Sequence, residues 1–72
     1  MLVDLGRRIS EARCDAGLTQ EAAASLAGID WRRWQRLERG TVNPTVSTLL
    51  RVAQALGLDF WQLVVRPRAK SA

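Results

Sequence analysis

A chain of 72 residues is long enough for one small domain. Hydrophobic residues make up 47% of it, which excludes an intrinsically disordered chain and predicts a packed core. The formal net charge of +4 favours an anionic partner, and all the basic residues except Lys70 are arginines. Cys14 is the only cysteine and histidine is absent, so neither an intramolecular disulfide nor a zinc site is expected.

Membrane proteins and enzymes are also disfavoured. No apolar run approaches the roughly 20 residues that span a bilayer, and the acidic residues near the start are not typical of a signal peptide. We therefore expect a cytoplasmic protein with no membrane partner. The sequence has no glycine-rich phosphate loop and no histidine base for Cys14, so no enzyme is indicated. No cofactor, metal or small-molecule ligand is expected.

The first half of the chain predicts two helices. The first covers about residues 2–15, where apolar residues at intervals of three and four form a stripe: Leu2, Leu5, Ile9, Ala12 and Ala16. The second follows the N-cap Thr19 and covers about residues 20–27. Gly28 then allows a turn with positive φ.

Three more helices are predicted in the second half. One follows the N-cap Asp30 and covers about residues 31–39. The next covers about residues 46–56, with an apolar face made of Val46, Leu49, Leu50, Ala53 and Leu56. The last covers about residues 60–65, where Asp59 and Gln62 can cap each other. We expect the domain to comprise residues 1–65 and the basic tail, residues 66–72, to be frayed.

The second and third predicted helices have the features of a helix-turn-helix. Ala24 and Ala27 are small enough for two helices to cross at close range. If Trp34 faces the core, a step of about 100° per residue places a cluster of arginines on the opposite side: Arg32, Arg36 and Arg39. Their guanidinium groups suit guanine edges and phosphates. An arginine-rich face alone is usually only a solvated face, but the ordered combination favours DNA binding.

Residues 5–64 resemble the Xre family, which comprises helix-turn-helix domains similar to phage Cro and repressor proteins. The residues that carry the resemblance are Gly6-Arg-Arg-Ile9, Arg13, Gly17-Leu-Thr-Gln20-Glu, Ala24, Ala27-Gly-Ile29, Leu37-Glu-Arg-Gly40, Asn43-Pro-Thr45, Leu49 and Ala53-Gln-Ala-Leu-Gly57. The resemblance implies an all-α fold, a compact five-helix lambda-repressor-like bundle. Its second and third helices would form the helix-turn-helix.

The resemblance also implies which residues meet DNA. Trp31, Arg32 and Arg36 occupy the places that usually read bases. The residues expected at the DNA backbone are Gln20, Arg33, Gln35, Arg39 and Asn43. An indole cannot make a bidentate base contact, so Trp31 either packs on a thymine methyl or sugar, or lies against Gln35 or the core rim.

Arg13 and Glu38 match a pair that the family often joins as a salt bridge between the first and third helices. The alternative is two independent surface charges. We favour the pair, because Glu38 projects towards the inner half of the third helix.

The last predicted helix carries more apolar residues than it can bury by itself: Phe60, Trp61, Leu63, Val64 and Val65. Family members commonly dimerise through this end, so we expect some of these residues to meet a second copy of the chain. A symmetric dimer would place two recognition helices about 34 Å apart on a palindrome. Alternatively, all five residues belong to the core of one chain, or Val64-Val65 continues as a short strand across the interface.

The function that this reading implies is a sequence-specific regulator of transcription that binds double-stranded DNA, as a homodimeric repressor or autoregulator. Two alternatives remain at this level. One is an antitoxin, or another protein-interaction module of a toxin–antitoxin pair. The other is a controller protein of a restriction-modification system.

Overall fold

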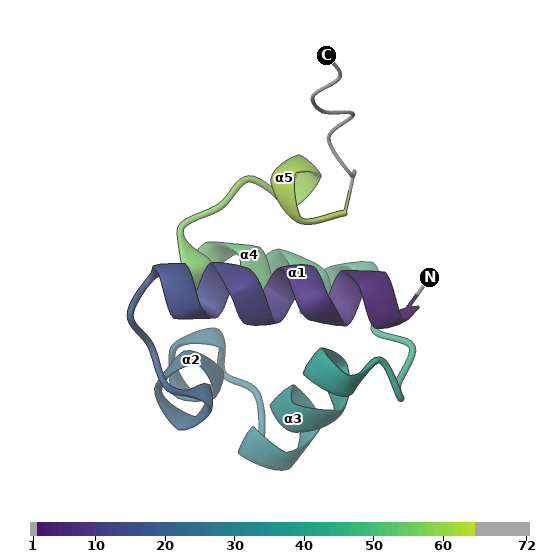
Figure 1. Ribbon diagram of the computed structural model, residues 1–72, viewed down its shortest axis with the longest axis horizontal. Coiled ribbons are helices and arrows are strands. Elements are labelled where there is room, and N and C mark those ends of the chain that lie inside the picture. The colour runs from purple at the N-terminus through teal and green to yellow at the C-terminus, as the bar shows by residue number, and fades with distance from the viewer. Residues whose placement is uncertain (1, 65–72) are drawn as a thin grey trace.

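The computed structural model describes residues 2–64, and this part of the chain contains helices and no strands (Figure 1). The helices are α1 (Leu2–Asp15), α2 (Gln20–Ala27), α3 (Trp31–Arg39), α4 (Val46–Leu56) and α5 (Phe60–Val64). The predicted all-α class with five helices is confirmed. Val65 and the tail at 66–72 lie outside the described residues, as does the predicted domain end. Within the described range, no helix is both long enough and apolar enough to cross a membrane.

Side-chain caps determine where the helices begin. Thr19 Oγ1 accepts a hydrogen bond from the backbone N–H of Ala22 at 3.0 Å, so α2 begins at the next residue, as predicted. Asp30 Oδ1 accepts from the backbone N–H of Arg32 at 2.8 Å and begins α3 in the same way. Thr45 caps α4. These bonds join residues two or three positions apart, which is why the sequence alone predicts the helix bounds.

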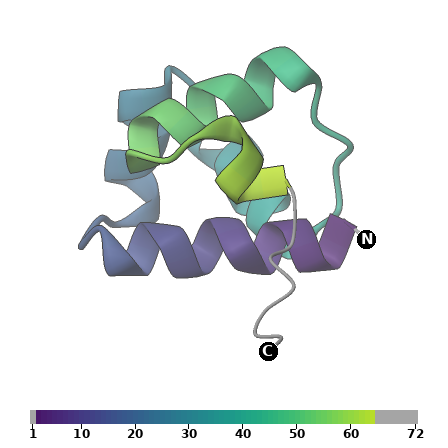
Figure 2. The ribbon, with the colours of Figure 1, turned by 90° about the horizontal axis from the view of Figure 1, so that it is seen from above.

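The helices pack around α1. In Figure 1, α1 crosses the middle of the molecule, with α2 and α3 on one side of it and α5 on the other. Seen from above, α5 lies between α1 and α4 (Figure 2), and it contacts both of them. α3 packs against α1, and α2 packs against both α3 and α4. The α2–α3 pair is therefore held from two sides, by α1 and by α4.

One buried cluster joins all five helices. Its members are Ile9, Ala23, Ala24, Ala27, Trp34, Leu37, Leu49, Val52, Ala53, Leu56 and Leu63. Trp34 and Leu37 are 0% and 3% exposed, so the prediction that this side of α3 faces inward is confirmed.

The predicted apolar faces of α1 and α4 are partly wrong. Ala16 lies beyond the end of α1 and is exposed. In α4, Val46 is 62% exposed and Leu50 is 50% exposed, whereas Val52 is completely buried. The buried stripe runs through Leu49 and Val52 because α2 and α5 pack on that side of α4. Periodicity predicts that a helix has an apolar side, but the packing partners decide which of several apolar residues lie under them.

Of the five apolar residues among which we expected some to meet a second copy of the chain, Leu63 is not available for such a contact. Leu63 is 0% exposed and belongs to the core, so a partner cannot reach it. Its carbonyl oxygen accepts a hydrogen bond from Arg8 Nη1 at 2.8 Å, which ties α5 to α1. Phe60 and Val64 are half-buried against the same core, while Trp61 is 69% exposed. The short helix therefore buries one side in its own domain and leaves Trp61 outside.

α1 and α3 approach each other closely at Gly6. A Cβ atom at this position would clash with the backbone carbonyl oxygen of Glu38 and would lie 2.6 Å from that of Leu37. Only a residue without a side chain lets the last turn of α3 lie this close to α1. Gly6 is one of the residues that carry the family resemblance, and this contact is the physical reason for a glycine at that position.

Candidate nucleic-acid interface

The solvent side of α3 carries four arginines: Arg32, Arg33, Arg36 and Arg39. All four are exposed, and none forms an ion pair with another residue in the range 2–64. Arg36 and Arg39 lie in the last turn, where the helix dipole favours positive charge. The helix thus presents free guanidinium groups on one side and buries Trp34 and Leu37 on the other. This is the surface that the sequence analysis expects to enter a DNA groove.

Two further candidates are Trp31, at the start of α3, and Asn43, in the segment that follows it. Trp31, the first residue of α3, is 43% exposed, so a large part of its indole is open to solvent. Asn43 is exposed in the segment between α3 and α4. Both positions leave the side chains free to meet a ligand that approaches α3 from outside.

A short turn holds α3 against α2. Gly28 ends α2 with a φ of 69°, a left-handed conformation that glycine adopts without strain. The backbone N–H of Ile29 then donates to the carbonyl oxygen of Ala24 at 2.9 Å. Ala24 and Ala27 are buried, and their small side chains let the two helices meet closely, as expected.

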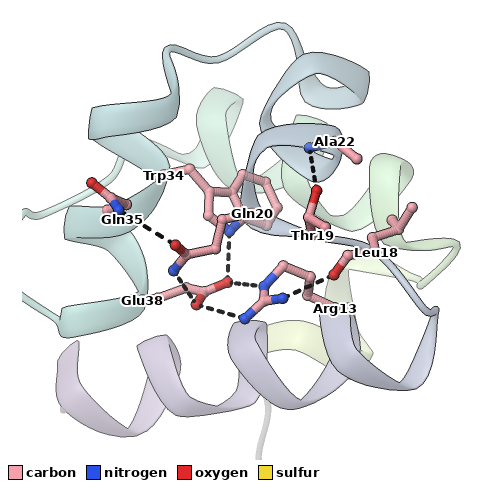
Figure 3. Close-up of polar contacts among 8 residues, drawn as sticks. All are labelled: Arg13, Leu18, Thr19, Gln20, Ala22, Trp34, Gln35 and Glu38. Carbon is pink, nitrogen blue, oxygen red and sulfur yellow. Dashed lines mark hydrogen bonds and ion pairs between the residues drawn. The ribbon is translucent and has the colours of Figure 1, made fainter.

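Beneath the interface, the carboxylate of Glu38 forms the expected ion pair with Arg13 (Figure 3). Arg13 Nε lies 2.6 Å from Glu38 Oε2, and Arg13 Nη2 lies 3.3 Å from Oε1. The side chains are only 15% and 8% exposed. Arg13 Nη1 also donates to the carbonyl oxygen of Leu18 at 2.8 Å, so one guanidinium joins α1, the following turn and α3.

The same carboxylate accepts two more hydrogen bonds that the sequence analysis did not anticipate. Trp34 Nε1 donates to Glu38 Oε2 at 2.6 Å, and Gln20 Nε2 donates to Oε1 at 2.9 Å. Trp34 and Glu38 are four residues apart on one helix, a spacing that places side chains next to each other, so this contact had a sequence signal. The Gln20 contact crosses from α2 to α3 and had none. The only polar atom of the buried Trp34 side chain, Nε1, thus has a hydrogen-bond partner in Glu38.

Gln20 and Gln35 contact each other and are also partly open to solvent. Gln35 Nε2 donates to Gln20 Oε1 at 3.4 Å, and both side chains are half-buried. From the sequence, each of the two is expected to contact the DNA backbone independently. In the structure, they form a hydrogen-bonded pair that reaches Glu38 through the amide nitrogen of Gln20.

The pKa of the Glu38 carboxyl lies below its ordinary value of 4.5. Burial is the largest single influence and acts to raise this pKa, but it is outweighed by the hydrogen bonds from Arg13, Gln20 and Trp34 together with the charge of Arg13. The hydrogen bond with Glu38 also raises the pKa of Arg13. The ionised pair is therefore the stable form in the folded protein.

This shift predicts a stability that depends on pH. Because folding lowers the pKa of Glu38, its ionisation stabilises the protein above the ordinary glutamate pKa, and this contribution is lost as the pH falls through the lower folded value. The difference in unfolding free energy between the wild type and Glu38→Gln should therefore shrink as the pH falls below about 6 and passes through the ordinary glutamate pKa and then the lower folded pKa. Urea unfolding at each pH measures it. Glu11→Gln, on the exposed side of α1, is the control; a Glu38→Gln difference that stays constant with pH would contradict the prediction.

Comparison with known proteins agrees with the helix-turn-helix arrangement of α2 and α3. A family model described as a helix-turn-helix domain matches residues 4–61. The chain is 42% identical over 60 residues to the HTH-type transcriptional regulator y4dJ of Sinorhizobium fredii, a match that covers 83% of this chain and 78% of the relative. It is 34% identical over 62 residues to the HTH-type transcriptional regulator PuuR of Escherichia coli, covering 86% of this chain but only 34% of PuuR. The chain thus spans about a third of the length of PuuR.

Solved structures are similar over most of the chain. The restriction-modification controller protein C.AhdI from Aeromonas hydrophila has a TM-score of 0.85 and 37% identity, covering 86% of this chain and 94% of C.AhdI. The transcription factor NHTF from Neisseria has a TM-score of 0.86 and 29% identity, covering 92% of this chain and 76% of NHTF. Since the family model matches most of the residues, the resemblance is confirmed: the chain belongs to the Xre-type helix-turn-helix family of DNA-binding transcriptional regulators.

Proposed function

We propose that the protein is a sequence-specific regulator that binds double-stranded DNA in the cytoplasm as a homodimer and acts as a repressor or autoregulator on a palindromic operator. The observation that carries this proposal is the exposed side of α3, whose four arginines have no carboxylate partner in the range 2–64. A helix fits the major groove, and an arginine can grip a guanine through O6 and N7. Free guanidinium groups on one helix face are suited to that contact.

The residues divide into two roles. Arg32, Arg36 and Trp31 read bases, and the exposed indole of Trp31 packs on a thymine methyl or a sugar. Contacts to the DNA backbone come from Gln20, Arg33, Gln35, Arg39 and Asn43. Backbone contacts orient the protein on the duplex and contribute affinity for every sequence, whereas base contacts discriminate between sequences.

Selection of bound sequences from a pool of random duplexes tests the proposal. A palindromic consensus with two half-sites one helical turn apart is the expected result, since a two-fold dimer presents two copies of α3. Retention of every sequence to the same extent would overturn sequence-specific binding. A single, unrepeated half-site would overturn the dimer and leave DNA binding in place.

Arg36→Ala is expected to weaken binding to the selected operator by about 1–3 kcal/mol and to relax the preference at one base pair of each half-site. The reason is the loss of a bidentate contact to a base edge. Fluorescence anisotropy with the operator and its single-base variants measures both effects. Asn43→Ala is the contrast, because a backbone contact is lost equally on every sequence. Equal operator binding by the wild type and Arg36→Ala would contradict the role of Arg36.

The proposed dimer uses an apolar surface on α4 and α5 made of Val46, Leu50, Phe60, Trp61 and Val64. Leu50 and Trp61 are 50% and 69% exposed, and Leu50 and Phe60 line a cleft of about 310 Å³ between the two helices. The rings of Phe60 and Trp61 meet edge to face, with centroids 5.7 Å apart. Large apolar side chains open to water at one place are typical of an interaction surface.

Trp61→Ser is expected to weaken the dimer by about 2 kcal/mol or more, because tryptophan is a frequent hot spot of interfaces. Its folding cost should be small, since the side chain is already exposed. Sedimentation equilibrium measures the association of the chain, which has a mass of 8.0 kDa. Val3→Ser, which changes a 65% exposed residue on α1, is the matched control. A wild type that stays monomeric while bound to its operator would contradict the dimer.

A second candidate within the same class is a controller of a restriction-modification system. The observation that favours it is the likeness to C.AhdI, which extends over 94% of that protein. The selected operator distinguishes the candidates: a controller's operator should lie upstream of a neighbouring restriction gene.

A further inference from the structure

A line of three hydrogen-bonded side chains runs from the interior to the surface that we propose faces DNA (Figure 3). The line begins at Glu38, continues to Gln20 through the bond from Gln20 Nε2 to Glu38 Oε1 at 2.9 Å, and ends at Gln35, whose Nε2 donates to Gln20 Oε1 at 3.4 Å. Glu38 itself is only 8% exposed. The line therefore links a buried charge to a residue at the edge of the α3 surface.

The charge at the inner end determines the direction of every bond. An ionised carboxylate only accepts hydrogen bonds, so Gln20 must turn its NH₂ group towards Glu38. Its carbonyl oxygen then faces Gln35, and Gln35 must in turn direct its NH₂ group towards Gln20. Rotating either amide by half a turn would place two acceptors, or two donors, against each other. Glu38 thus imposes one orientation on both amides, although it is remote from the surface.

The outer end of the line is a hydrogen-bond acceptor. Gln35 Oε1 takes part in no hydrogen bond with another residue in the described range, and Gln35 is next to the exposed Arg36. In the major groove, adenine and cytosine each present an exocyclic amino group, whereas guanine and thymine present carbonyl oxygens. An amide held with its oxygen outward accepts from the amino groups and is repelled by the carbonyl oxygens.

We infer that Gln35 determines base specificity by accepting a hydrogen bond from adenine or cytosine, and that Gln20 and Glu38 act as positioning residues that hold its amide in this orientation. This inference rests on the proposed function, because it requires α3 to enter the major groove. Gln35 would then contact a base as well as the DNA backbone, and this base contact would lie beside those of the arginines. Gln20 keeps one amide hydrogen that is not used within the line, so its own contact to a phosphate is compatible with its positioning role.

The test compares base preference among variants by selection from random duplexes and by anisotropy on the single-base series. Gln35→Ala should remove a preference of about 5-fold for adenine or cytosine over guanine or thymine at one position of each half-site, the effect of one hydrogen bond. Gln20→Met has a similar size but cannot orient Gln35, so it should reduce that preference to within about twofold while Gln35 is still present. Gln20→Met should add nothing to this loss when Gln35 is already alanine. Glu11→Met, at an exposed position of α1, is the control for the introduction of a methionine.

A second measurement does not depend on DNA. In the free protein, NMR of the side-chain amides should show that Gln20→Met shifts the Gln35 NH₂ resonances and speeds their exchange with water, while thermal melting shows that the variant is folded. Unchanged Gln35 resonances, or a Gln20→Met variant with the wild-type base preference, would overturn the positioning role. If the wild type selects no sequence at all, the proposed function fails together with this inference. If it selects an operator but Gln20→Met behaves as the wild type, only the inference fails.

Discussion

Glu38→Ala should lower the free energy of unfolding by about 3–5 kcal/mol, the range measured when one member of a buried ion pair is removed. The variant leaves the Arg13 guanidinium largely buried without its counter-ion. It also leaves the indole N–H of Trp34 without an acceptor inside a core where that side chain is 0% exposed. Urea denaturation followed by circular dichroism measures the loss.

The control for this prediction is the other ion pair among the described residues. Arg7 and Asp4 lie 3.2 Å apart on α1, but their side chains are 63% and 46% exposed. Asp4→Ala should therefore cost less than about 1 kcal/mol, because an exposed pair contributes little. Similar losses for Glu38→Ala and Asp4→Ala would mean that the buried carboxylate does not organise the α1–α3 contact.

Gly6→Ala should destabilise the protein by about 3 kcal/mol, near the upper end of the cost of overpacking. The added methyl group meets the backbone carbonyl oxygens of Leu37 and Glu38, and backbone atoms cannot rotate away as a flexible side chain can. In an open helix, the same change would be favourable by up to about 1 kcal/mol, because alanine forms helices better than glycine. The sign of the effect therefore tests the close approach directly. Thermal and urea unfolding give the value.

Gly17→Ala is the control for a change from glycine to alanine without a clash. Gly17 has a φ of 73°, and a Cβ atom there would meet nothing within 4 Å. Its cost should be about 1 kcal/mol from the left-handed conformation alone. A Gly6→Ala variant as stable as the wild type, or no less stable than Gly17→Ala, would show that α1 and α3 separate without cost. Because α3 carries the residues that we propose to contact DNA, we also expect Gly6→Ala to weaken operator binding.

The structure changes which residues we propose for the dimer surface and how we describe two of the candidate DNA contacts. Leu50 and Val46 are exposed and Leu63 is buried, so the proposed dimer surface extends from α5 onto α4 instead of covering the whole of α5. Gln20 and Gln35 are coupled through hydrogen bonds to Glu38, whereas the sequence treats them as separate contacts. In both cases the correction concerns residues that are distant in sequence and close in space.

The helix bounds and the two-sided character of α3 can be predicted from the residues alone. Thr19 and Asp30 act on backbone groups two or three positions away, and the inward Trp34 and outward Arg36 follow from the helical repeat. These effects are local, so they can be read along the chain. The packing of the helices determines which apolar residues of α4 and α5 are covered and why position 6 is a glycine. It also brings Trp34 and Gln20 to the carboxylate of Glu38, which they share with Arg13. Those features depend on where one helix crosses another, and a crossing is set by the packing of all five helices at once.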